Sequence, residues 1–391
     1  MRILVLTHNY PRFPADPAGA FVRRIALSAA CSGAEVCVLA PHGRGLETDG
    51  RDGPLRVLRF RYAPERFERI AYTGELHRRA EVSPLFALGV PLFLASFRRA
   101  ARRAVAKFRP DVVHAHWWLP GGWVASTLER PYLITCHGSD VRLLERRWMR
   151  WFARPVFRRA AAVTTVSEFL ARDLRQLLGE PLPRIVPLVM PVDIAQFSAG
   201  RITPPATPPR ILYAGNLIAS KGVDTLIRAF AALRDQGIVC QLKLLGEGSA
   251  ARPLRLLAQQ LGLVDIVWST FVPQDQMASE YGAATVTVLP TLGQAEGLGL
   301  TLVEALLAGS AAIGTTAGGI PETIRDGETG VLVPAGDVPA LTAALLRMLT
   351  EPDFRRRTML AGRAAAEAKF SPERAVAPFL ELYADLARDR T

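Results

Sequence analysis

The sequence predicts an α/β protein with two doubly wound domains. Short apolar runs alternate with amphipathic stretches along the first half of the chain, as they do where strands and helices alternate. A second series of the same kind opens with Arg210-Ile-Leu-Tyr-Ala-Gly, which echoes the opening Arg2-Ile-Leu-Val-Leu. Between the two series, residues 198–209 are too rich in proline for a helix or a central strand, so we predict that they form the interdomain linker.

The first domain is predicted to begin with a strand at residues 3–7 and a helix at 19–30. Further apolar runs predict strands at residues 35–40, 111–115, 132–136 and 163–166. This alternation of strand and amphipathic segment is typical of a doubly wound α/β domain.

The second domain is predicted to begin with a strand at Arg210, followed by an amphipathic helix marked by Val223, Leu226, Ile227 and Phe230. Its other strands are expected at residues 241–245, 266–268, 285–289, 311–314 and 330–333, and a last helix at 371–390. Ligands of such sheets bind at the carboxyl ends of the strands. We therefore expect the residues that directly follow strands in both domains to face one interdomain cleft.

Composition limits the class of protein. The chain has 391 residues, 49% of them hydrophobic and 21% charged, which is the profile of a soluble globular protein of two domains. No basic and apolar leader precedes the first strand, so we expect a cytoplasmic protein. The four cysteines lack zinc-site spacing, and no Asp-x-Asp occurs, so we predict catalysis without a bound metal.

Positive charge is concentrated in the first half of the chain. Residues 1–200 contain 30 lysines and arginines against 17 acidic residues, whereas residues 201–391 contain 18 against 19. Such a local excess suggests a large anionic partner. Because no nucleic-acid-binding signature is present, we expect no nucleic acid partner and favour an anionic membrane surface.

Two stretches support peripheral attachment to the inner face of the cell membrane. Residues 84–97 are mostly apolar, too short to span a bilayer, and run into Arg98-Arg-Ala-Ala-Arg-Arg103. Residues 142–159 interleave seven arginines with four aromatic residues, Trp148, Trp151, Phe152 and Phe157. The alternative is that both stretches are ordinary helices with a buried face and solvated arginines.

The most informative stretch is Glu296-Gly-Leu-Gly-Leu-Thr-Leu-Val-Glu304. A carboxylate inside an otherwise apolar helix is costly, so Glu304 needs a polar partner. The glycines and the free N–H groups of a helix start favour phosphate, while both glutamates can accept hydrogen bonds from sugar hydroxyls. Hydroxyl groups on either side of a phosphate predict a nucleotide sugar.

Lys221 and two histidines of the first domain are further candidates. Lys221 precedes a helix start, where a cation is unfavourable unless an anion is bound there, and lysine is rare in this chain; the alternative is a solvated surface lysine. His137 follows a strand and can point into the cleft, or it can be structural. His114 and His116 share one side of a strand, where packing is a better reading than a metal site because no third ligand is near.

Three motifs carry a resemblance to a known family: Glu296-Gly-Leu-Gly, Glu304-Ala-Leu-Leu-Ala-Gly and Gly318-Gly-Ile-Pro-Glu322. The run from Pro290 to Asp337 that holds them resembles the donor-binding half of glycosyltransferase family 4, retaining enzymes of the GT-B fold. The resemblance extends over nearly the whole chain. It implies two Rossmann-like domains facing an interdomain cleft, with residues 1–197 binding the acceptor, residues 210–370 binding the donor, and a C-terminal helix at 371–391 that packs back on the first domain.

The resemblance also implies roles for individual residues. His137, Glu296 and Lys221 are expected to be catalytic. The residues expected to bind the donor are Gly19, Asn216, Gly246, Gly297, Leu298, Gly299, Leu300 and Glu304. Asn216 stands where the family commonly has an arginine, so a phosphate contact at this position is in doubt, and Gly19 could equally belong to a plain turn.

The resemblance implies a hexosyltransferase-type enzyme that uses a nucleotide-diphosphate sugar, expected to be a UDP- or GDP-sugar, and no cofactor. The basic first domain suggests a lipid-linked or saccharide acceptor, as in cell-surface polysaccharide or glycolipid biosynthesis. Two alternatives stay open. A nucleotide-sugar epimerase on a similar fold would convert the donor alone, and a non-catalytic protein would bind the sugar nucleotide without turnover.

Overall fold

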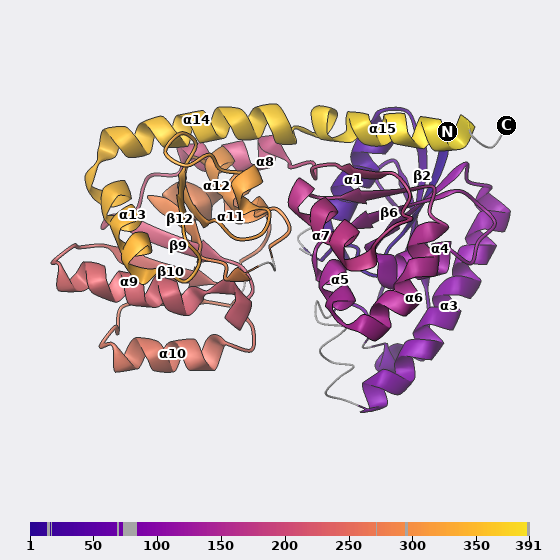
Figure 1. Cartoon of the computed structure of the whole chain (residues 1–391), viewed down its shortest axis with the longest axis horizontal. Helices are drawn as coiled ribbons and strands as arrows, with labels where there is room; N and C mark the ends of the chain where they lie inside the picture. The colour runs from indigo at the N-terminus through magenta and orange to yellow at the C-terminus, as the bar shows by residue number, and fades with distance from the viewer. Residues whose placement is uncertain are drawn as a thin grey trace. The chain divides into compact units, whose positions relative to one another are not determined.

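The computed structural model describes residues 1–13, 16, 18–68, 70–72, 84–270, 272–293 and 296–388. The chain divides into two compact units (Figure 1). The first domain consists of Met1–Pro191 together with Pro372–Thr391, and the second domain is Val192–Ser371. Each is an α/β domain with its own sheet and its own core.

The described part of the first domain contains an eight-stranded sheet in the order β3-β4-β2-β1-β5-β6-β7-β8. All neighbouring strands are parallel except β3 and β4. The strands are β1 (Arg2–Leu6), β2 (Glu35–Pro41), β3 (Asp49–Asp52), β4 (Leu55–Phe60), β5 (Val112–His116), β6 (Tyr132–Cys136), β7 (Ala162–Thr165) and β8 (Ile185–Pro187). Leu4 of the central strand β1 lies opposite Cys37 and Val113, and helices cover both faces, which explains the continuous apolar run of β1.

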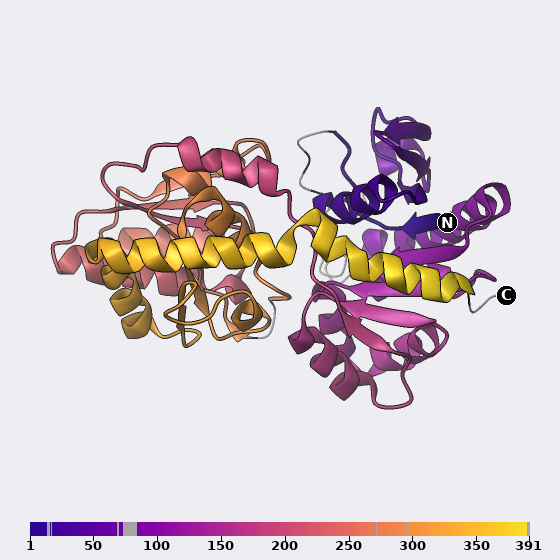
Figure 2. The ribbon, with the colours of Figure 1, turned by 90° about the horizontal axis from the view of Figure 1, so that it is seen from above.

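The described helices of the first domain lie on both sides of this sheet. They are α1 (Ala20–Cys31), α3 (Pro84–Phe108), α4 (Trp123–Ala125), α5 (Ser139–Arg142), α6 (Arg147–Arg158), α7 (Glu168–Leu178) and α15 (Pro372–Arg388). Helices α3 and α4 contact each other on one side, and α1 and α15 contact each other on the opposite side (Figure 1). The last helix, α15, runs across the strands of the first sheet (Figure 2).

The second domain has a six-stranded parallel sheet in its described residues, in the order β11-β10-β9-β12-β13-β14. The strands are β9 (Arg210–Ala214), β10 (Gln241–Leu245), β11 (Val267–Ser269), β12 (Val286–Leu289), β13 (Ala311–Thr315) and β14 (Val331–Val333). The amphipathic helix predicted after Lys221 is α9 (Val223–Asp235), and its Leu226, Ile227 and Phe230 are fully buried in the core of this domain.

Helices cover both faces of the second sheet as well. The others are α8 (Ile194–Ser198), α10 (Ala251–Gln260), α11 (Met277–Ala283), α12 (Leu300–Ala308), α13 (Val338–Thr350) and α14 (Pro352–Phe370). Helix α9 packs on α10 and α13, whereas α12 packs on α8, α11 and α14, so the two groups cover opposite faces (Figure 1).

The strands predicted from the sequence are present, each within one residue of its predicted bounds. Strands β3, β4 and β8 were not predicted. The boundary between the domains lies at Pro191–Val192, before the proline-rich segment that we expected to be the linker. That segment belongs to the second domain because Arg201 donates to the backbone oxygen of Leu307 at 2.9 Å, and a Cβ on Gly200 would lie only 2.1 Å from the oxygen of Ala278.

Candidate active site

The strand order of the second sheet reverses at one place. The chain runs from β9 outward to β10 and β11, and then returns to the other side of β9 for β12, β13 and β14. In open parallel sheets, ligands bind beyond the carboxyl ends of the two strands at such a switch point. Here these strands are β9 and β12, so a ligand is expected beside the loops that follow them, which include the described residues 215–222 and 290–293 and 296–299.

Lys221 and Glu296 come from these two loops and form an ion pair. Lys221 Nζ donates to Glu296 Oε2 over 2.5 Å, and the two side chains are only 19% and 15% exposed. The other carboxylate oxygen, Oε1, accepts the backbone N–H of Gly299 at 3.2 Å. The sequence analysis placed both residues in the site but did not predict that they pair. Removal of one partner would leave a mostly buried charge without compensation, so the pair holds the two loops together.

The backbone of Glu296 is held by two neighbouring glycines. Gly319 donates its N–H to the oxygen of Glu296 at 3.0 Å. A Cβ on Gly318 would lie 2.3 Å from the same oxygen, and φ of Gly318 is +58°. Only glycine allows this approach without strain. The Gly-Gly pair after β13 therefore fixes the position of the carboxylate that meets Lys221.

The segment after Glu296 leads into helix α12. Gly297 and Leu298 are buried, Gly299 has a φ of 79°, and Leu300 is the first helical residue. The Leu298 carbonyl accepts the Thr323 hydroxyl at 2.6 Å. Since the Gly299 N–H is bonded to the Glu296 carboxylate, the start of α12 already carries the negative charge that a helix start favours. A phosphate bound at this place would replace the carboxylate as the acceptor of the Gly299 N–H.

Glu304 lies one turn into α12 and is half-buried. Its helix neighbours Val303 and Ala305 are fully buried, and Tyr281 donates its hydroxyl to Glu304 Oε2 at 3.3 Å. The polar partner that this carboxylate was expected to need is therefore present. The expected contact with a nucleotide remains a prediction.

Gly246 brings the loop after β10 against the loop after β9. A Cβ on Gly246 would lie 1.9 Å from the oxygen of Gly215, and a Cβ on Gly248 would lie 2.2 Å from the oxygen of Leu217. Close backbone packing therefore accounts for both glycines. Asn216 is exposed between these loops, and its side chain makes no hydrogen bond to another residue in the described ranges. Its backbone oxygen accepts the Tyr213 hydroxyl at 2.8 Å.

The first sheet also has a switch point, between β1 and β5. Beyond these strands, five rings form a cluster. Trp117 lies at its centre, with ring centroids 4.3 Å from His8, 5.6 Å from Phe21 and 4.6 Å from His137. Trp117 has a φ of 61°, which is strained for a bulky residue. Strained residues often mark functional sites, and this one directly follows β5.

His137 and His116 are hydrogen-bonded to each other within this cluster. His116 Nδ1 lies 3.0 Å from His137 Nε2, and the two rings stack with centroids 5.2 Å apart. Burial lowers the pKa of His137 to about 3, with smaller contributions from neighbouring histidines. Burial likewise lowers the pKa of His116 well below its ordinary value. Both imidazoles are therefore neutral at pH 7, and His137 can form hydrogen bonds without bringing a charge.

Asp140 positions the main chain around His137. Its Oδ1 accepts the backbone N–H of His137 at 3.0 Å and of Gly138 at 3.1 Å, while Oδ2 accepts that of Trp118 at 3.2 Å. Burial raises the pKa of Asp140, although these hydrogen bonds oppose the shift. Asp140 therefore holds the backbone of His137 and also that of Gly138, the residue that directly precedes α5.

His114 is fully buried, and both of its ring nitrogens are hydrogen-bonded within the first domain. Its Nδ1 lies 2.7 Å from the hydroxyl of Tyr383 in α15, and its Nε2 lies 2.6 Å from Thr135 Oγ1. Burial lowers its pKa to about 3. The packing role expected for His114 agrees with these contacts, which attach the last helix to β5.

Gly19 precedes α1 with a left-handed φ of 69°. A Cβ there would lie 2.1 Å from the oxygen of Asn9 and 2.9 Å from Cα of Tyr10. The close approach of the helix start to the loop after β1 is sufficient to require glycine. A contact between Gly19 and the donor stays a prediction.

Comparison with known proteins identifies the family. The description "Glycosyltransferase Family 4" matches residues 18–196, and "Glycosyl transferases group 1" matches residues 197–365. A D-inositol 3-phosphate glycosyltransferase of Streptomyces bingchenggensis is 30% identical over 354 residues, which cover 81% of this chain and 76% of that protein. The chain belongs to glycosyltransferase family 4.

Other similarities agree with membership of family 4. A protein of Escherichia coli K12 is 32% identical over 252 residues, and its name is "Putative colanic acid biosynthesis glycosyltransferase WcaL". That match spans 61% of each protein. Sucrose-phosphate synthase from Thermosynechococcus elongatus superposes with a TM-score of 0.81 at 23% identity over 99% of each chain, which supports the GT-B fold.

The candidate site also contains residues that the sequence analysis did not single out. His8, Phe21 and Trp117 surround His137, and Tyr281 meets Glu304. Trp117 directly follows β5, and His8 lies two residues after the end of β1, so their positions just beyond strand ends are the signal that could have found them. None of the helices within the described ranges is both long and apolar enough to cross a bilayer.

Proposed function

We propose that this chain is a retaining glycosyltransferase that moves a hexosyl group from a nucleotide-diphosphate sugar to an acceptor hydroxyl. A UDP- or GDP-sugar is the proposed donor class, and no metal is required. The observation that carries the proposal is the Lys221–Glu296 ion pair at the switch point of the second sheet. It offers a cation for phosphate and a carboxylate for sugar hydroxyls at one place.

In the proposed mechanism, the donor diphosphate replaces Glu296 as the partner of Lys221. The diphosphate competes because it carries more negative charge than one carboxylate. The backbone N–H of Gly299 changes from the carboxylate to a phosphate oxygen, and the released Glu296 accepts hydrogen bonds from the sugar. Glu304 accepts hydrogen bonds from the ribose, next to the hydroxyl of Tyr281.

The chemical step is the exchange of one C–O bond for another at the anomeric carbon. The acceptor oxygen attacks on the face from which the diphosphate leaves, and the leaving phosphate takes the proton of the acceptor hydroxyl. Negative charge grows on the leaving oxygen, and the ammonium group of Lys221 stabilises it electrostatically. In this proposal, neutral His137 forms a hydrogen bond to the donor sugar, and its orientation is maintained by Asp140.

The test is an assay of nucleotide release from UDP-, GDP-, ADP- and TDP-sugars, with and without a membrane extract as the source of acceptor. Release that depends on the acceptor, continues in EDTA and gives a product of unchanged anomeric configuration by NMR supports the proposal. Epimerised donor would favour an epimerase instead, and tight binding without turnover would favour a non-catalytic binder.

We further propose that the acceptor is lipid-linked and that the enzyme works at the inner face of the cell membrane, in cell-surface polysaccharide or glycolipid assembly. Helix α6 supports this proposal. Its Trp148, Trp151 and Phe152 are 58%, 72% and 51% exposed, while Met149 and Phe157 on its other face are buried. Large exposed aromatic side chains at one helix face are typical of a membrane interface.

The charges around this aromatic face fit an anionic bilayer. Arg147 and Arg158 are exposed and form no hydrogen bond or ion pair with another residue in the described part of the chain. Such arginines attract acidic headgroups while aromatic rings enter the interface. The other stretch considered for this role is less suitable, since Phe93 and Phe97 of α3 are buried against Phe60. The side chains of residues 84–88 lie outside the described part.

A further inference from the structure

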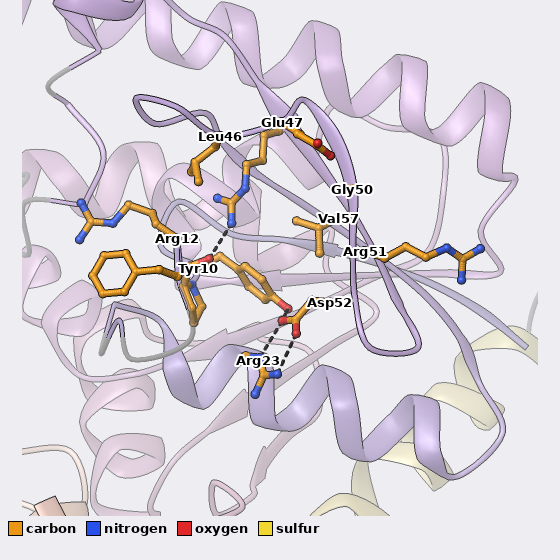
Figure 3. Close-up of a pocket in the computed structure, with 12 residues that line it drawn as sticks. Tyr10, Arg12, Arg23, Leu46, Glu47, Gly50, Arg51, Asp52 and Val57 are labelled. Atoms are coloured by element: carbon orange, nitrogen blue, oxygen red, sulfur yellow. Dashed lines mark hydrogen bonds and ion pairs between the residues drawn. The ribbon is translucent and has the colours of Figure 1, made fainter. Parts of the chain in front are cut away.

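A polar cavity lies in the first domain, between the loop after β1, helix α1 and the β3–β4 hairpin (Figure 3). Its volume of about 480 Å³ is within the range of small-molecule pockets, roughly 300–1,000 Å³. Four arginines line it, Arg12, Arg23, Arg51 and Arg59, together with the acids Glu47 and Asp52. Its lining includes none of the residues assigned above to the active site.

Two of the four arginines are neutralised within the protein. Arg23 binds Asp52 through both carboxylate oxygens, at 2.6 and 2.7 Å, and Tyr10 donates its hydroxyl to Asp52 at 2.8 Å (Figure 3). Burial opposes ionisation of Asp52, but these bonds outweigh it and keep the pKa below its ordinary value. Arg12 binds Asp16 in a similar way, at 2.6 and 3.2 Å. These two ion pairs hold the side chains of Arg12 and Arg23 in place along the cavity wall.

The other two arginines, Arg51 and Arg59, form no ion pair within the described residues. Arg59 donates to the backbone oxygens of Pro11 at 2.6 Å and Pro41 at 3.4 Å and to the hydroxyl of Tyr72 at 2.8 Å, all of them neutral acceptors. Arg51 is exposed at the rim and makes no hydrogen bond or ion pair with another residue of the described ranges. An anion in the cavity would therefore meet one pre-oriented guanidinium and one that is free to turn towards it.

The remaining lining residues suit a sugar that carries such an anion. Glu47 is exposed at the rim, so it is solvated and does not cancel the charge inside. Phe13 is 51% exposed, and the Arg12 guanidinium lies 5.7 Å from the centre of its ring. An exposed aromatic face beside a few placed polar groups is typical of small-molecule sites.

We propose that this cavity binds an anionic group, a phosphate or a carboxylate, carried by the sugar unit that accepts the transferred hexose. Arginine forks match both groups in geometry, which favours them over neutral sugars. Tyr10, which lines the cavity, is two residues after His8 of the ring cluster. The loop that follows β1 therefore contributes to both the cavity and the ring cluster. The acceptor role rests on the proposed function, whereas the binding of the anion does not.

The test is isothermal titration calorimetry of the full chain with glucose 6-phosphate, glucuronate and glucose as probes. The variants are Arg51→Ala and Arg59→Met, and Arg44→Ala is the matched control, because Arg44 is an exposed arginine of the same region outside the lining. The Arg51 side chain forms no hydrogen bond or ion pair within the described residues, so its variant keeps the test valid if Arg59→Met fails to fold. Titration with UDP in parallel reports on the donor site of the second domain.

We expect saturable binding of glucose 6-phosphate, of glucuronate or of both, which distinguishes phosphate from carboxylate recognition, and about tenfold weaker binding of glucose. Arg51→Ala and Arg59→Met should weaken the binding of the anionic probe, whereas Arg44→Ala should leave its affinity unchanged. Equal binding of glucose, or equal weakening by Arg44→Ala, would overturn the proposal. Binding of UDP with no binding of either anionic probe would overturn it too, while leaving the proposed donor site intact.

Discussion

Lys221 and Glu296 lie 75 residues apart in the sequence, yet their 2.5 Å contact joins the loops beyond β9 and β12. A second lysine–glutamate pair in the same domain offers a comparison. Lys243 Nζ lies 2.7 Å from both carboxylate oxygens of Glu280, and the side chains are 14% and 21% exposed. The two pairs are buried to a similar extent, but Lys243 lies within β10 and not beyond the end of a strand.

Replacing Lys221 with methionine should lower kcat/KM by about 100-fold or more, because the growing charge on the leaving diphosphate loses its cation. Lys243→Met should lose comparable stability and leave kcat/KM close to the wild-type value. Initial rates at 25 °C and urea unfolding of both variants provide the measurement. Equal losses of kcat/KM in the two variants would assign the effect to folding and remove Lys221 from the mechanism.

The first domain should lose stability as the pH falls. Burial lowers the pKa of His114 and of His137 to about 3, whereas a histidine in the unfolded chain titrates near 6.5. Between these values the unfolded chain binds protons that the folded chain does not, so the free energy of unfolding rises with pH in this window. At pH 5 the expected loss relative to pH 7 is on the order of 1–2 kcal/mol per histidine.

Tryptophan fluorescence during urea unfolding measures this effect, because five of the six tryptophans belong to the first domain. The midpoint should be lower at pH 5 than at pH 7, and His114→Gln should reduce the difference. A midpoint that does not change between these pH values would show that the histidines titrate normally in the folded state.

Substitution of Gly246 by alanine should lower the free energy of unfolding through a steric clash. Gly237 serves as the comparison, because it shares the positive φ but has no close neighbour. A Cβ at Gly246 would lie 1.9 Å from the Gly215 oxygen, whereas a Cβ at Gly237 would meet nothing within 4 Å, and both have a positive φ. Gly237→Ala therefore adds backbone strain alone, and Gly246→Ala should cost about 2 kcal/mol more. Circular dichroism during urea unfolding gives the two values; equal losses would contradict the close packing of the two loops.

Membrane attachment through α6 gives a prediction for vesicle binding. Replacing Trp148 and Trp151 with serine should greatly reduce co-sedimentation with vesicles that contain anionic lipid, since the rings no longer enter the interface. Leu256→Ser is the control, because Leu256 is a similarly exposed apolar residue of the second domain. Undiminished binding of the tryptophan variant, or equal loss in the control, would contradict the role of α6.

The central strands could be predicted from the sequence because strands buried on both faces are continuous apolar runs, as Ile3-Leu-Val-Leu is. The edge strands give weaker signals. In β4, Arg56 lies between Leu55 and Val57, but Leu58 and Arg59 interrupt the alternation of apolar and charged residues. Strand β8 has only three residues, which is too short for a periodic pattern.

Glu296, Glu304 and Lys221 could be found from the sequence because each is a charge in an unusual local setting. Their partners could not be found in this way. The contact of Lys221 with Glu296, and that of Tyr281 with Glu304, depend on which strands are neighbours in the sheet. The cavity of Tyr10 and Arg59 was missed for a related reason, since its walls include β3 and β4, which were not predicted.

The attachment of α15 to the first domain affects how the chain folds during synthesis. Residues 1–191 leave the ribosome first, but Phe379 and Tyr383, which pack against β5, are about 190 residues later. At roughly 5–20 residues per second, the nascent first domain waits about 10–40 s for this helix. The second domain is contiguous and can fold within that interval, so the domain that starts first is the one completed last.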